Sequence, residues 1–507
     1  MNAPRRPLRT LAIAVLGVCA LSVLGLLSCG EEETAPKSEF SLIYYDGHVH
    51  TSRSDGTGTV ADVKATALAR GLSAVIITDH CKDLTQAEWA SLKAETAAVS
   101  DSTFLALPAF EMTGSEGLLN RGHMNAYNAP DPFVGDDALE QCPEEVWTDP
   151  PNPAGTGANA ASLAEWAEYV NAQGGIVNHN HTSGSTQLSY GVDNIEIYNQ
   201  GHVDDVFGYA KLLGYSDPQA LGFALTMNNL AIYGERDLGM LVPFPGFPTP
   251  IPLRVAIYYA TLGFTGVGQW LGAPQAPLNS WDQLLMAYVN GTVDKPIFAV
   301  ANSDAHNTGD PDSKVGSAKN GLYVLALTPR QVYKAIEAGR SFATTGPSLA
   351  VDVNGMLMGS TAYVPKSGTA NLNLSANSES PTAVLAKIDI IKNGQVVQTI
   401  SPMSPTYAAT LSYPMTERGY YRVEVTSVDG LTGAYQFAYS NPVFVKCPFD
   451  KDCDGHLDLI EKLLGSNPDD ATSTPEHIVV PGTCRDTVDN DGDTLIDAAD
   501  PGCRWAR

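Results

Sequence analysis

The sequence predicts an α/β fold built on a parallel sheet, followed by a small all-β unit. Three observations lead to this prediction. Short apolar runs alternate with helix-like segments between residues 42 and 301, histidines and acidic residues follow several of these runs, and short strands with turns replace the helices from about residue 349. Strands that alternate with helices indicate a parallel sheet covered by helices. Such folds carry their functional residues at the C-terminal ends of the strands.

The first predicted strand, residues 42–45, leads into a polar loop that contains His48 and His50. Residues two apart in a strand face the same side, so we expect the two imidazoles to point toward one position. Imidazole nitrogens suit Zn, Fe and Mn ions, and a carboxylate such as Asp55 completes a mixed nitrogen and oxygen set. The segment therefore predicts a metal site.

The same arrangement returns along the chain. Further predicted strands each carry or precede metal-binding residue types: 73–78 before Asp79 and His80, 104–110 before Glu111, 122–127 with His123, 174–181 with His179 and His181, and 296–301 before Asp304 and His306. Predicted helices at 60–70, 85–99 and 162–172 lie between them. One more strand, 194–199, contains Glu196, which we expect to be either a substrate contact or a structural group. The recurrence is a stronger indication than any single motif.

Together these residues resemble the motif set of the PHP (polymerase and histidinol phosphatase) superfamily. The matching positions are His48, His50, Asp55, Asp79, His80, Glu111, His123, His181, Asp304 and His306. The stretch from Thr328-Pro329 to Gly346-Pro347 also resembles the CehA/McbA, carbaryl-hydrolase-like branch of that superfamily. The resemblance covers roughly residues 42–445 and implies a distorted (β/α)7 barrel that holds two or three divalent ions.

The resemblance also implies which residues hold each ion. It assigns His48, His50, Glu111 and Asp304 to the first ion, Glu111 as a bridge with His123 and His181 to the second, and Asp55, His80 and His306 to a third. His179 lies on the same predicted strand face as His181 and could replace or support it. Imidazole and carboxylate ligands bind Zn, Mn and Fe alike, so the sequence does not select one of these metals.

This ligand set implies a hydrolase for a small-molecule substrate, and we expect an anionic phosphoester. Two bridged ions can lower the pKa of a water and hold it in line with a phosphoryl or carbonyl centre. Glu111 and Asp304 are the expected catalytic carboxylates. Hydrolysis of a carbamate, ester or amide is the alternative reaction. A non-catalytic surface-binding protein that keeps its metals for structure is the alternative of another class.

Two further residues are candidates for the catalytic site. Asp79 could orient a ligand histidine, or it could stabilise a structural turn. Arg340 could contact an anionic substrate, or it could form a salt bridge.

The N-terminus has the pattern of an export signal. Arg5, Arg6 and Arg9 precede an apolar run over residues 11–27, which ends before Ser28-Cys29-Gly30. This resembles a bacterial lipobox, so we expect a signal peptide over 1–28, a lipid on Cys29 and a tether over 29–41. The absence of aspartate after Cys29 favours the outer membrane or cell surface. An uncleaved transmembrane anchor is the alternative.

Export permits disulfides. Six cysteines remain beyond Cys19 and Cys29. Their local spacing favours the pairs Cys447–Cys453 and Cys484–Cys503, which leaves Cys81 with Cys142 by elimination.

The predicted hydrolase domain covers residues 42–348 and contains an insertion at 201–293. The insertion is rich in aromatic residues and proline. It could be a lid over the site or plain packing. Residues 349–446 contain short strands separated by turns, among them Asn393-Gly394, a strong hairpin signal. We expect a small β-sandwich there.

The last predicted segment, 447–507, is an acidic, disulfide-clipped tail. Its first loop matches the EF-hand calcium-ligand spacing, and a second acidic run is a looser copy. The expected calcium residues are Asp450, Asp452, Asp454, His456, Asp458, Glu461, Asp489, Asp491, Asp493, Asp497 and Asp500. An acidic tail without bound calcium is the alternative. The net charge of −26 makes nucleic-acid binding a poor expectation, because phosphate backbones attract basic surfaces.

Overall fold

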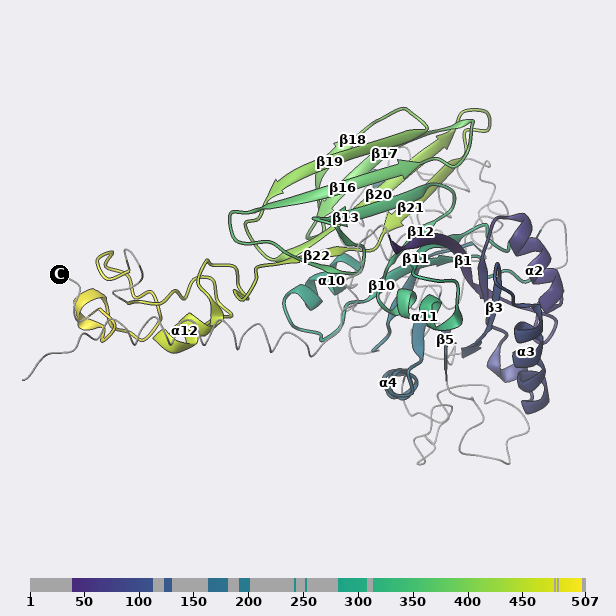
Figure 1. The fold of residues 1–507 in the computed structure, drawn as a ribbon, viewed down its shortest axis with the longest axis horizontal. Coiled ribbons are helices and arrows are strands. Elements are labelled where there is room, and N and C mark those ends of the chain that lie inside the picture. Colours follow the sequence, from purple (N-terminus) through teal and green to yellow (C-terminus); the bar gives the residue numbers. More distant parts are fainter. Residues whose placement is uncertain are drawn as a thin grey trace, which may run out of the picture.

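The computed structural model describes residues 39–112, 123–129, 163–180, 191–200, 241–242, 251–252, 281–307, 313–477, 480 and 483–503. Within these residues the chain forms a mixed α/β fold with several sheets and few helices (Figure 1). Four sheets are present among the described strands, with eleven, five, four and two strands.

The first part of the fold follows the predicted strand and helix alternation. It contains parallel strands β1 (Ser41–Val49), β2 (Ala74–Ile77) and β3 (Leu105–Pro108), helices α2 (Val60–Ala69) and α3 (Gln86–Val99), and a short 3-10 turn, η2 (Cys81–Asp83). Both helices begin with a capping box, formed by Thr59 with Asp62 and by Thr85 with Glu88. These reciprocal contacts satisfy amides that the first helical turn leaves without a backbone partner. The two helix predictions are confirmed.

A five-stranded sheet continues the chain in the order β10-β7-β6-β5-β4. Its elements are β4 (Phe110–Met112), β5 (Met124–Tyr127), β6 (Ile176–His179), β7 (Asn194–Asn199) and β10 (Phe298–Asn302), with α4 (Leu163–Ala172) before β6. Strands β6, β7 and β10 are parallel, as predicted. Strand β5 is antiparallel to both of its neighbours, so the sheet departs from a uniform parallel repeat.

Two isolated bridges join this sheet to the first strands. Val49, at the end of β1, pairs with Ala305, and His80, after β2, pairs with Glu111 of β4. Both bridges lie where the candidate ligands are. The two sheets therefore meet at the C-terminal ends of β1 and β2.

The first sheet is covered on both faces. Val75 and Ile77 of β2 belong to a core that includes Leu92 of α3. Ile76, which points the other way, belongs to a second core with Ile336 of α11 (Pro329–Glu337). A strand buried on both faces has the continuous apolar sequence seen here, rather than an alternating one.

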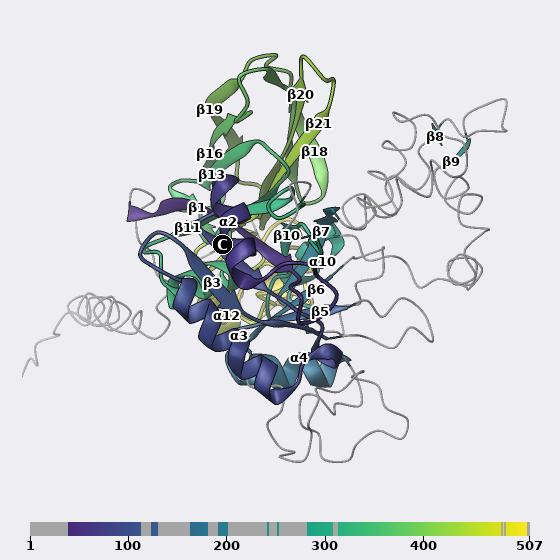
Figure 2. The same cartoon turned by 90° about the vertical axis from the view of Figure 1, so that its right-hand side faces the viewer.

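The second half of the described chain is mostly antiparallel β-structure. Its strands are β11 (Lys319–Val324), β12 (Ser341–Thr344), β13 (Ser348–Val353), β14 (Met356–Leu357), β15 (Thr361–Tyr363), β16 (Thr369–Asn377), β17 (Ala383–Lys392), β18 (Gln395–Ile400), β19 (Thr406–Pro414), β20 (Gly419–Asp429), β21 (Tyr435–Ser440) and β22 (Val443–Lys446). The sheet β14-β13-β16-β19 packs on the sheet that contains β17 and β20, and Figure 2 shows β13, β16 and β19 beside β20. Val351 and Leu372 of the first sheet belong to one core with Ile390 and Val423 of the second. This is the arrangement expected of a sandwich.

The predicted hairpin at Asn393-Gly394 is confirmed, since it joins β17 to β18. Both residues have positive φ, 50° and 78°. A two-residue turn that matches the twist of its strands requires this backbone, which explains the Asn-Gly sequence.

The two halves share hydrogen bonds across the predicted boundary at residue 349. Strand β12 pairs with β11 on one side and with β21 on the other. Asn441 also pairs its side chain with the backbone of Ala299 in β10, at 2.8 Å and 3.2 Å. One sheet thus runs through both halves.

A buried ion pair provides a second connection. Asp282, on α10 (Trp281–Val289), accepts two hydrogen bonds of 2.7 Å from Arg422 of β20, and one of 2.7 Å from Tyr420. The Arg422 guanidinium also lies 4.8 Å from the ring centroid of Trp281. Helix α10 belongs to the predicted 201–293 insertion, and this ion pair holds it against the sandwich. Apart from residues 281–293 and the short strands β8 (Leu241–Val242) and β9 (Ile251–Pro252), that insertion lies outside the described residues.

The tail contains α12 (Asp458–Leu464) and a 3-10 turn, η5 (Asp497–Ala499), and in Figure 1 it lies to the left of the other units. It holds the disulfides Cys447–Cys453 and Cys484–Cys503, as predicted. Cys81 is buried and disulfide-bonded, but Cys142 is outside the described residues, so their pairing stays a prediction. Among the described helices, none has the length and apolar character needed to cross a membrane.

Candidate metal centre

The end of β1 is anchored by a buried carboxylate, Asp46. The pairing of β1 with β2 shifts register between Asp46 and Val49, so simple alternation does not place Asp46 on the face of the histidines. Asp46 accepts hydrogen bonds from the amides of Ser303, at 3.1 Å, and Gly316, at 2.8 Å. Burial raises the pKa of the Asp46 carboxyl to about 6 in spite of these bonds. The strand end is thereby tied to the segments after β10 and before β11.

Four side chains meet beyond this anchor. His48 Nε2 lies 3.4 Å from Glu111 Oε2 and 3.1 Å from Asp304 Oδ1. His50 Nε2 lies 3.3 Å and 3.2 Å from the same two oxygens, and 3.1 Å from His48 Nε2. Both histidines and Glu111 are buried. The structure thus brings together the four residues that the motif resemblance assigns to a first ion.

The spacing of these four atoms fits ligands around one cation. Four ligands held at about 2.05 Å in a tetrahedron lie about 3.3 Å from one another. Five of the six separations between these atoms run from 3.1 to 3.4 Å. Two imidazole nitrogens with two carboxylate oxygens are also a donor set that Zn, Mn and Fe accept. The residues therefore fit a divalent ion.

Asp304 reaches the group from an unusual backbone conformation. Its φ is +53°, in the left-handed region, which aspartate adopts more readily than most residues other than glycine. The next residue is fixed by a hydrogen bond of 2.9 Å from the His50 amide to the Ala305 carbonyl oxygen. Such locally strained backbone persists where the surroundings hold it in place. Here it directs the carboxylate toward the histidines.

Glu111 extends from the first group into a second. Its Oε1 atom lies 3.0 Å from His123 Nδ1, and its Oε2 atom lies 3.1 Å from His80 Nδ1. Asn180 donates a hydrogen bond of 2.8 Å to Oε1. One carboxylate with an oxygen in each group is placed to bridge two ions. His181, the other predicted ligand of this ion, lies outside the described residues.

A third group is more exposed. Asp55 Oδ2 lies 3.5 Å from His80 Nε2 and 3.3 Å from His306 Nε2. His306 Nδ1 hydrogen-bonds the Asp304 carbonyl oxygen at 2.9 Å, which leaves Nε2 as its accepting nitrogen. His80 has one nitrogen facing the second group and one facing the third. Because a neutral imidazole has a single accepting nitrogen, His80 can serve one of those two ions but not both.

Burial and neighbouring charges act in opposite directions on these histidines. Burial alone would lower the pKa of His48, but the carboxylates around its ring, led by Asp304, raise it well above the usual value. Burial likewise opposes the rise for His50, whose bonds to Asp304 and Glu111 bring its pKa to about 10. The buried carboxylates thus favour positive charge at this position, and a divalent cation would supply it.

Asp79 shapes the loop between His50 and Asp55. It accepts hydrogen bonds from the amide and the hydroxyl of Thr51, at 2.6 Å and 2.7 Å, and from the hydroxyl of Ser54, at 3.0 Å. The Ser54 hydroxyl also lies 3.4 Å from His50 Nδ1. Of the two predicted roles, the contacts favour stabilisation of this loop, with an indirect effect on His50.

Arg340 lies away from the cluster, which disfavours the first of its two predicted roles, contact with an anionic substrate. It precedes β12, and its guanidinium is 5.3 Å from the ring centroid of Phe40. Phe40 precedes β1, whereas the candidate ligands follow the other end of that strand. The glycine before Arg340 marks the end of α11, and a sequence pattern alone does not show at which end of the sheet that turn lies.

His179 ends β6 and is buried, opposite Met124 in the strand register. Asn178 and Asn180 are hydrogen-bonded to each other, and Asn180 faces Glu111. Alternation along the strand places His179 on the other face. The choice between His179 and His181 as a ligand stays open, since His181 is outside the described residues.

Several buried asparagines around the cluster were missed by the sequence analysis. Asn180 binds Glu111, as described, and Asn302 links two strands by accepting from the Gly47 amide at 2.9 Å and donating to Glu196 at 2.8 Å. Asparagine is depleted in strands, so its presence at the ends of buried strands was the available signal.

The first tail loop forms a compact ring of carboxylates. Asp450, Asp452 and Asp454 each place an oxygen within 4.8 Å of the others. In this part of the described chain, one oxygen of each of them and one of Glu461 is buried without a hydrogen-bond partner. Asp450 and Glu461 are almost fully buried, at 6% and 0% exposure. The remaining predicted positions support the loop: the His456 amide donates to Asp454, and Asp458 accepts from the Lys451 amide.

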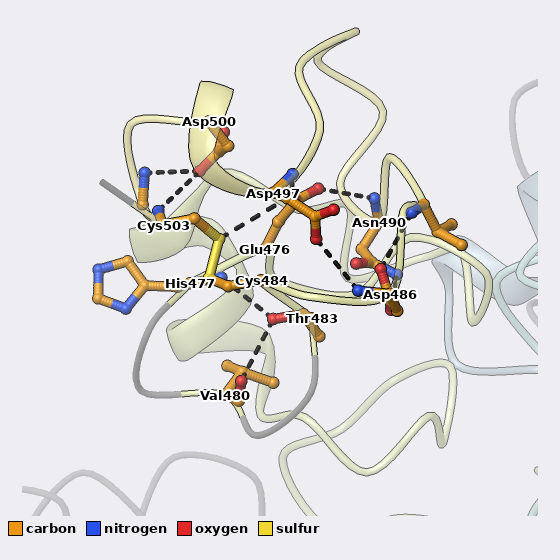
Figure 3. The surroundings of a disulfide bond; sticks show 12 residues. Glu476, His477, Val480, Thr483, Cys484, Asp486, Asn490, Asp497, Asp500 and Cys503 are labelled. Atoms are coloured by element: carbon orange, nitrogen blue, oxygen red, sulfur yellow. Dashed lines mark hydrogen bonds between the residues drawn. A yellow bond between two sulfur atoms is a disulfide. The ribbon is translucent and has the colours of Figure 1, made fainter. Parts of the chain in front are cut away.

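In the second acidic run, two of the predicted residues, Asp489 and Asp491, approach each other. They are joined by Glu476, which the sequence analysis did not select. Asp497 accepts from the amides of Asp486 and Thr487 (Figure 3). Three more predicted positions bind backbone amides: Asp500 accepts from Gly502 and Cys503, Asp493 from Leu495, and Asp491 from Asp493.

No protein-family model and no curated protein matches the chain. Among solved structures, a two-domain protein containing a predicted PHP-like metal-dependent phosphoesterase from Bacteroides vulgatus is 11% identical, with a TM-score of 0.34, covering 82% of this chain and 98% of that protein. A candidate metal-dependent phosphoesterase from Bifidobacterium adolescentis is 20% identical, with a TM-score of 0.22, covering 31% and 78%. An amidohydrolase from Chromobacterium violaceum with bound sulfate and no metal is 16% identical, with a TM-score of 0.20, covering 33% and 81%. Similarity at this level carries no argument about function, so the support for a function comes from the geometry of the site.

Proposed function

We propose that the chain is a metal-dependent hydrolase, acting on a phosphoester through two or three divalent ions. The observation that carries the proposal is the meeting of His48, His50, Glu111 and Asp304 at separations that fit one cation. Buried acidic groups gathered without a compensating cation would be costly. The motif resemblance supports the same assignment and a distorted seven-stranded barrel around it.

Each side chain has a distinct task in this proposal. His48, His50 and Asp304 would hold the first ion. Glu111 would bind both the first and the second ion, and His123 would bind the second. Bound divalent ions lower the pKa of a water toward neutrality and polarise a phosphoryl group. Asp55 and His306 lie at the exposed side of the cluster, where a substrate can approach. The segments 181–190 and 201–240, which follow β6 and β7, are outside the described residues.

The test compares substrates and variants of the exported protein. Metal-free protein would be supplied in turn with Mn or Zn and assayed on p-nitrophenyl phosphate, bis(p-nitrophenyl) phosphate and an aryl carbamate. We expect phosphoester turnover that Glu111→Gln and His50→Ala remove while the fold is kept. Glu337→Gln, on the exposed face of α11, is the control.

Two outcomes would redirect the proposal. Turnover of the carbamate alone would select the alternative reaction. Stoichiometric metal without turnover of any substrate would select the non-catalytic surface-binding alternative.

We propose further that the first tail loop binds calcium. The support is the set of buried, unpartnered oxygens on Asp450, Asp452, Asp454 and Glu461 within the described tail, and the match of their spacing to an EF-hand loop. Calcium would remove the repulsion between these carboxylates. Isothermal titration with Ca²⁺ tests this, and Glu461→Gln should abolish the binding.

Export as a lipoprotein through Cys29 also remains a proposal, supported by the lipobox-like sequence. Metabolic labelling with palmitate should mark the parent chain and leave Cys29→Ala unlabelled. A label on both chains would contradict it.

A further inference from the structure

His48 contacts a carboxylate on each side of its ring. Its Nε2 atom faces Asp304 and Glu111, as described, and its Nδ1 atom lies 2.9 Å from Glu196 Oε1. Both side chains are fully buried, with 0% of each exposed. The ring is therefore held between the proposed metal position and Glu196.

Glu196 is itself fixed by two neighbours. Its Oε1 atom accepts a hydrogen bond of 2.8 Å from Asn302, and its Oε2 atom accepts one of 2.9 Å from Asn199. Asn302 also accepts from the amide of Gly47, the residue before His48. One network thus fixes both the backbone that leads to His48 and the far nitrogen of its ring.

Strand topology explains how these residues meet. His48 belongs to β1, Glu196 to β7 and Asn302 to β10. Strand β10 is parallel to β7, and Val300 of β10 is in register with Glu196. The bridge from Val49 to Ala305 brings β1 to the end of β10. Asn302 therefore spans the junction between the two sheets.

A carboxylate at Nδ1 has a defined chemical effect. It accepts the Nδ1 proton, so the ring adopts the tautomer whose lone pair is on Nε2, and the ring cannot rotate without losing that bond. It also makes the imidazole a stronger ligand. Neither effect requires Glu196 to touch the ion or a substrate.

We propose that Glu196 is a positioning residue that orients His48 toward the first metal ion. This inference rests on the proposed metal site and goes beyond it, since the sequence offered Glu196 only as a substrate contact or a structural group. Groups that hold a ligand histidine in this way affect metal affinity by about 10- to 100-fold when they are removed.

The experiment measures metal binding instead of turnover. Full-length mature protein, stripped of transition metals and held in excess Ca²⁺, would be titrated with Co²⁺, whose visible spectrum reports ligand number and geometry. We expect Glu196→Ala to lose about 10- to 100-fold in affinity for one Co²⁺ and to alter the spectrum of that site. Glu196→Gln, which keeps an accepting oxygen, should fall between Glu196→Ala and the parent.

The matched control is Asp193→Asn. Asp193 is also a buried carboxylate in the same part of the chain, but it accepts from the Val177 amide and pairs with Lys295 instead of facing the cluster. It should leave the Co²⁺ affinity and spectrum unchanged. Equal losses in Glu196→Ala and Asp193→Asn would show a general structural effect and overturn the inference.

The remaining outcomes separate this inference from the proposed function. If His50→Ala loses a Co²⁺ ion but Glu196→Ala binds as the parent does, the metal site stands and the role of Glu196 is refuted. If His50→Ala binds as much Co²⁺ as the parent does, the proposed metal site fails and the inference fails with it.

Discussion

His48 Nε2 and Asp304 Oδ1 lie 3.1 Å apart, although one residue belongs to the first strand of the described chain and the other follows β10. Their contact depends on the bridge between Val49 and Ala305, which closes β1 against that later segment. The candidate metal centre is therefore a product of tertiary structure, and changes to either partner test it directly.

Asp304→Asn should weaken metal binding without unfolding the protein. The amide keeps the size of the side chain but removes one negative charge from the proposed ligand set. We expect the affinity for the first ion to fall by more than the about 10- to 100-fold that loss of a supporting group costs, with unchanged circular dichroism. Metal analysis after dialysis measures it, and a parent-like metal content would contradict the assignment of Asp304.

Chelation should remove activity reversibly. The residues around the cluster come from both sheets and are held by Asp46, Asp79 and Asn302 independently of any ion. A preformed site of this kind should regain turnover when Mn or Zn returns. Residual activity after complete metal removal would refute metal dependence, whereas irreversible unfolding would show that the ions hold the fold.

Much of this site was accessible from the sequence, because strand periodicity places His48 and His50 on one face and the other ligand types recur after strands. The identity of the ligand candidates depends only on such local patterns. What the sequence did not show were the groups that act over long distances. Asn302 and Asp46 matter through partners on other strands. The distance of Arg340 from the cluster was not accessible either, since a local turn motif carries no information about strand ends.

The fold shows the same division. Helices α2 and α3 were predictable because their caps and apolar spacing lie within a few residues. The antiparallel direction of β5 and the sheet that continues through β12 into β21 were not, because both are set by pairing between distant segments. Glu476 was missed for this reason too, since it joins an acidic loop that follows it in the chain.

Breaking the buried ion pair should destabilise the junction between the two halves. Arg422 is fully buried and Asp282 nearly so, and the pair is bidentate. Removing Arg422 leaves the buried Asp282 without a cation, which costs about 3–5 kcal/mol. Removing Asp282 leaves Arg422 with Glu424 as its remaining carboxylate, which should cost less. Chemical denaturation of Asp282→Ala and Arg422→Met measures this loss.

The double variant Asp282→Leu with Arg422→Met is the control for this pair. Replacing both charges with apolar groups should recover part of the stability, because the one carboxylate that then loses its partner, Glu424, is 12% exposed. A double variant as unstable as the sum of the single variants would show that the pair contributes little as a pair.

The tail should respond to pH and calcium together. In the calcium-free loop, burial and then repulsion by neighbouring carboxylates raise the pKa of Asp452 from 3.8 to about 6 and that of Glu461 from 4.5 to about 7. Both pKa values lie above those of the unfolded chain. At pH values between the unfolded and the folded pKa, the folded loop therefore binds more protons than the unfolded chain does. The stabilisation from these two groups is therefore largest below about pH 4 and is lost as the pH rises through 6 and 7.

Calcium bound as proposed would replace those protons, so Ca²⁺ should raise the melting temperature of the tail more at pH 8 than at pH 5. Differential scanning calorimetry with Ca²⁺ and with chelator measures the difference, and Glu461→Gln should reduce it at pH 8. An equal or larger calcium effect at pH 5 would show that these carboxylates do not face the ion.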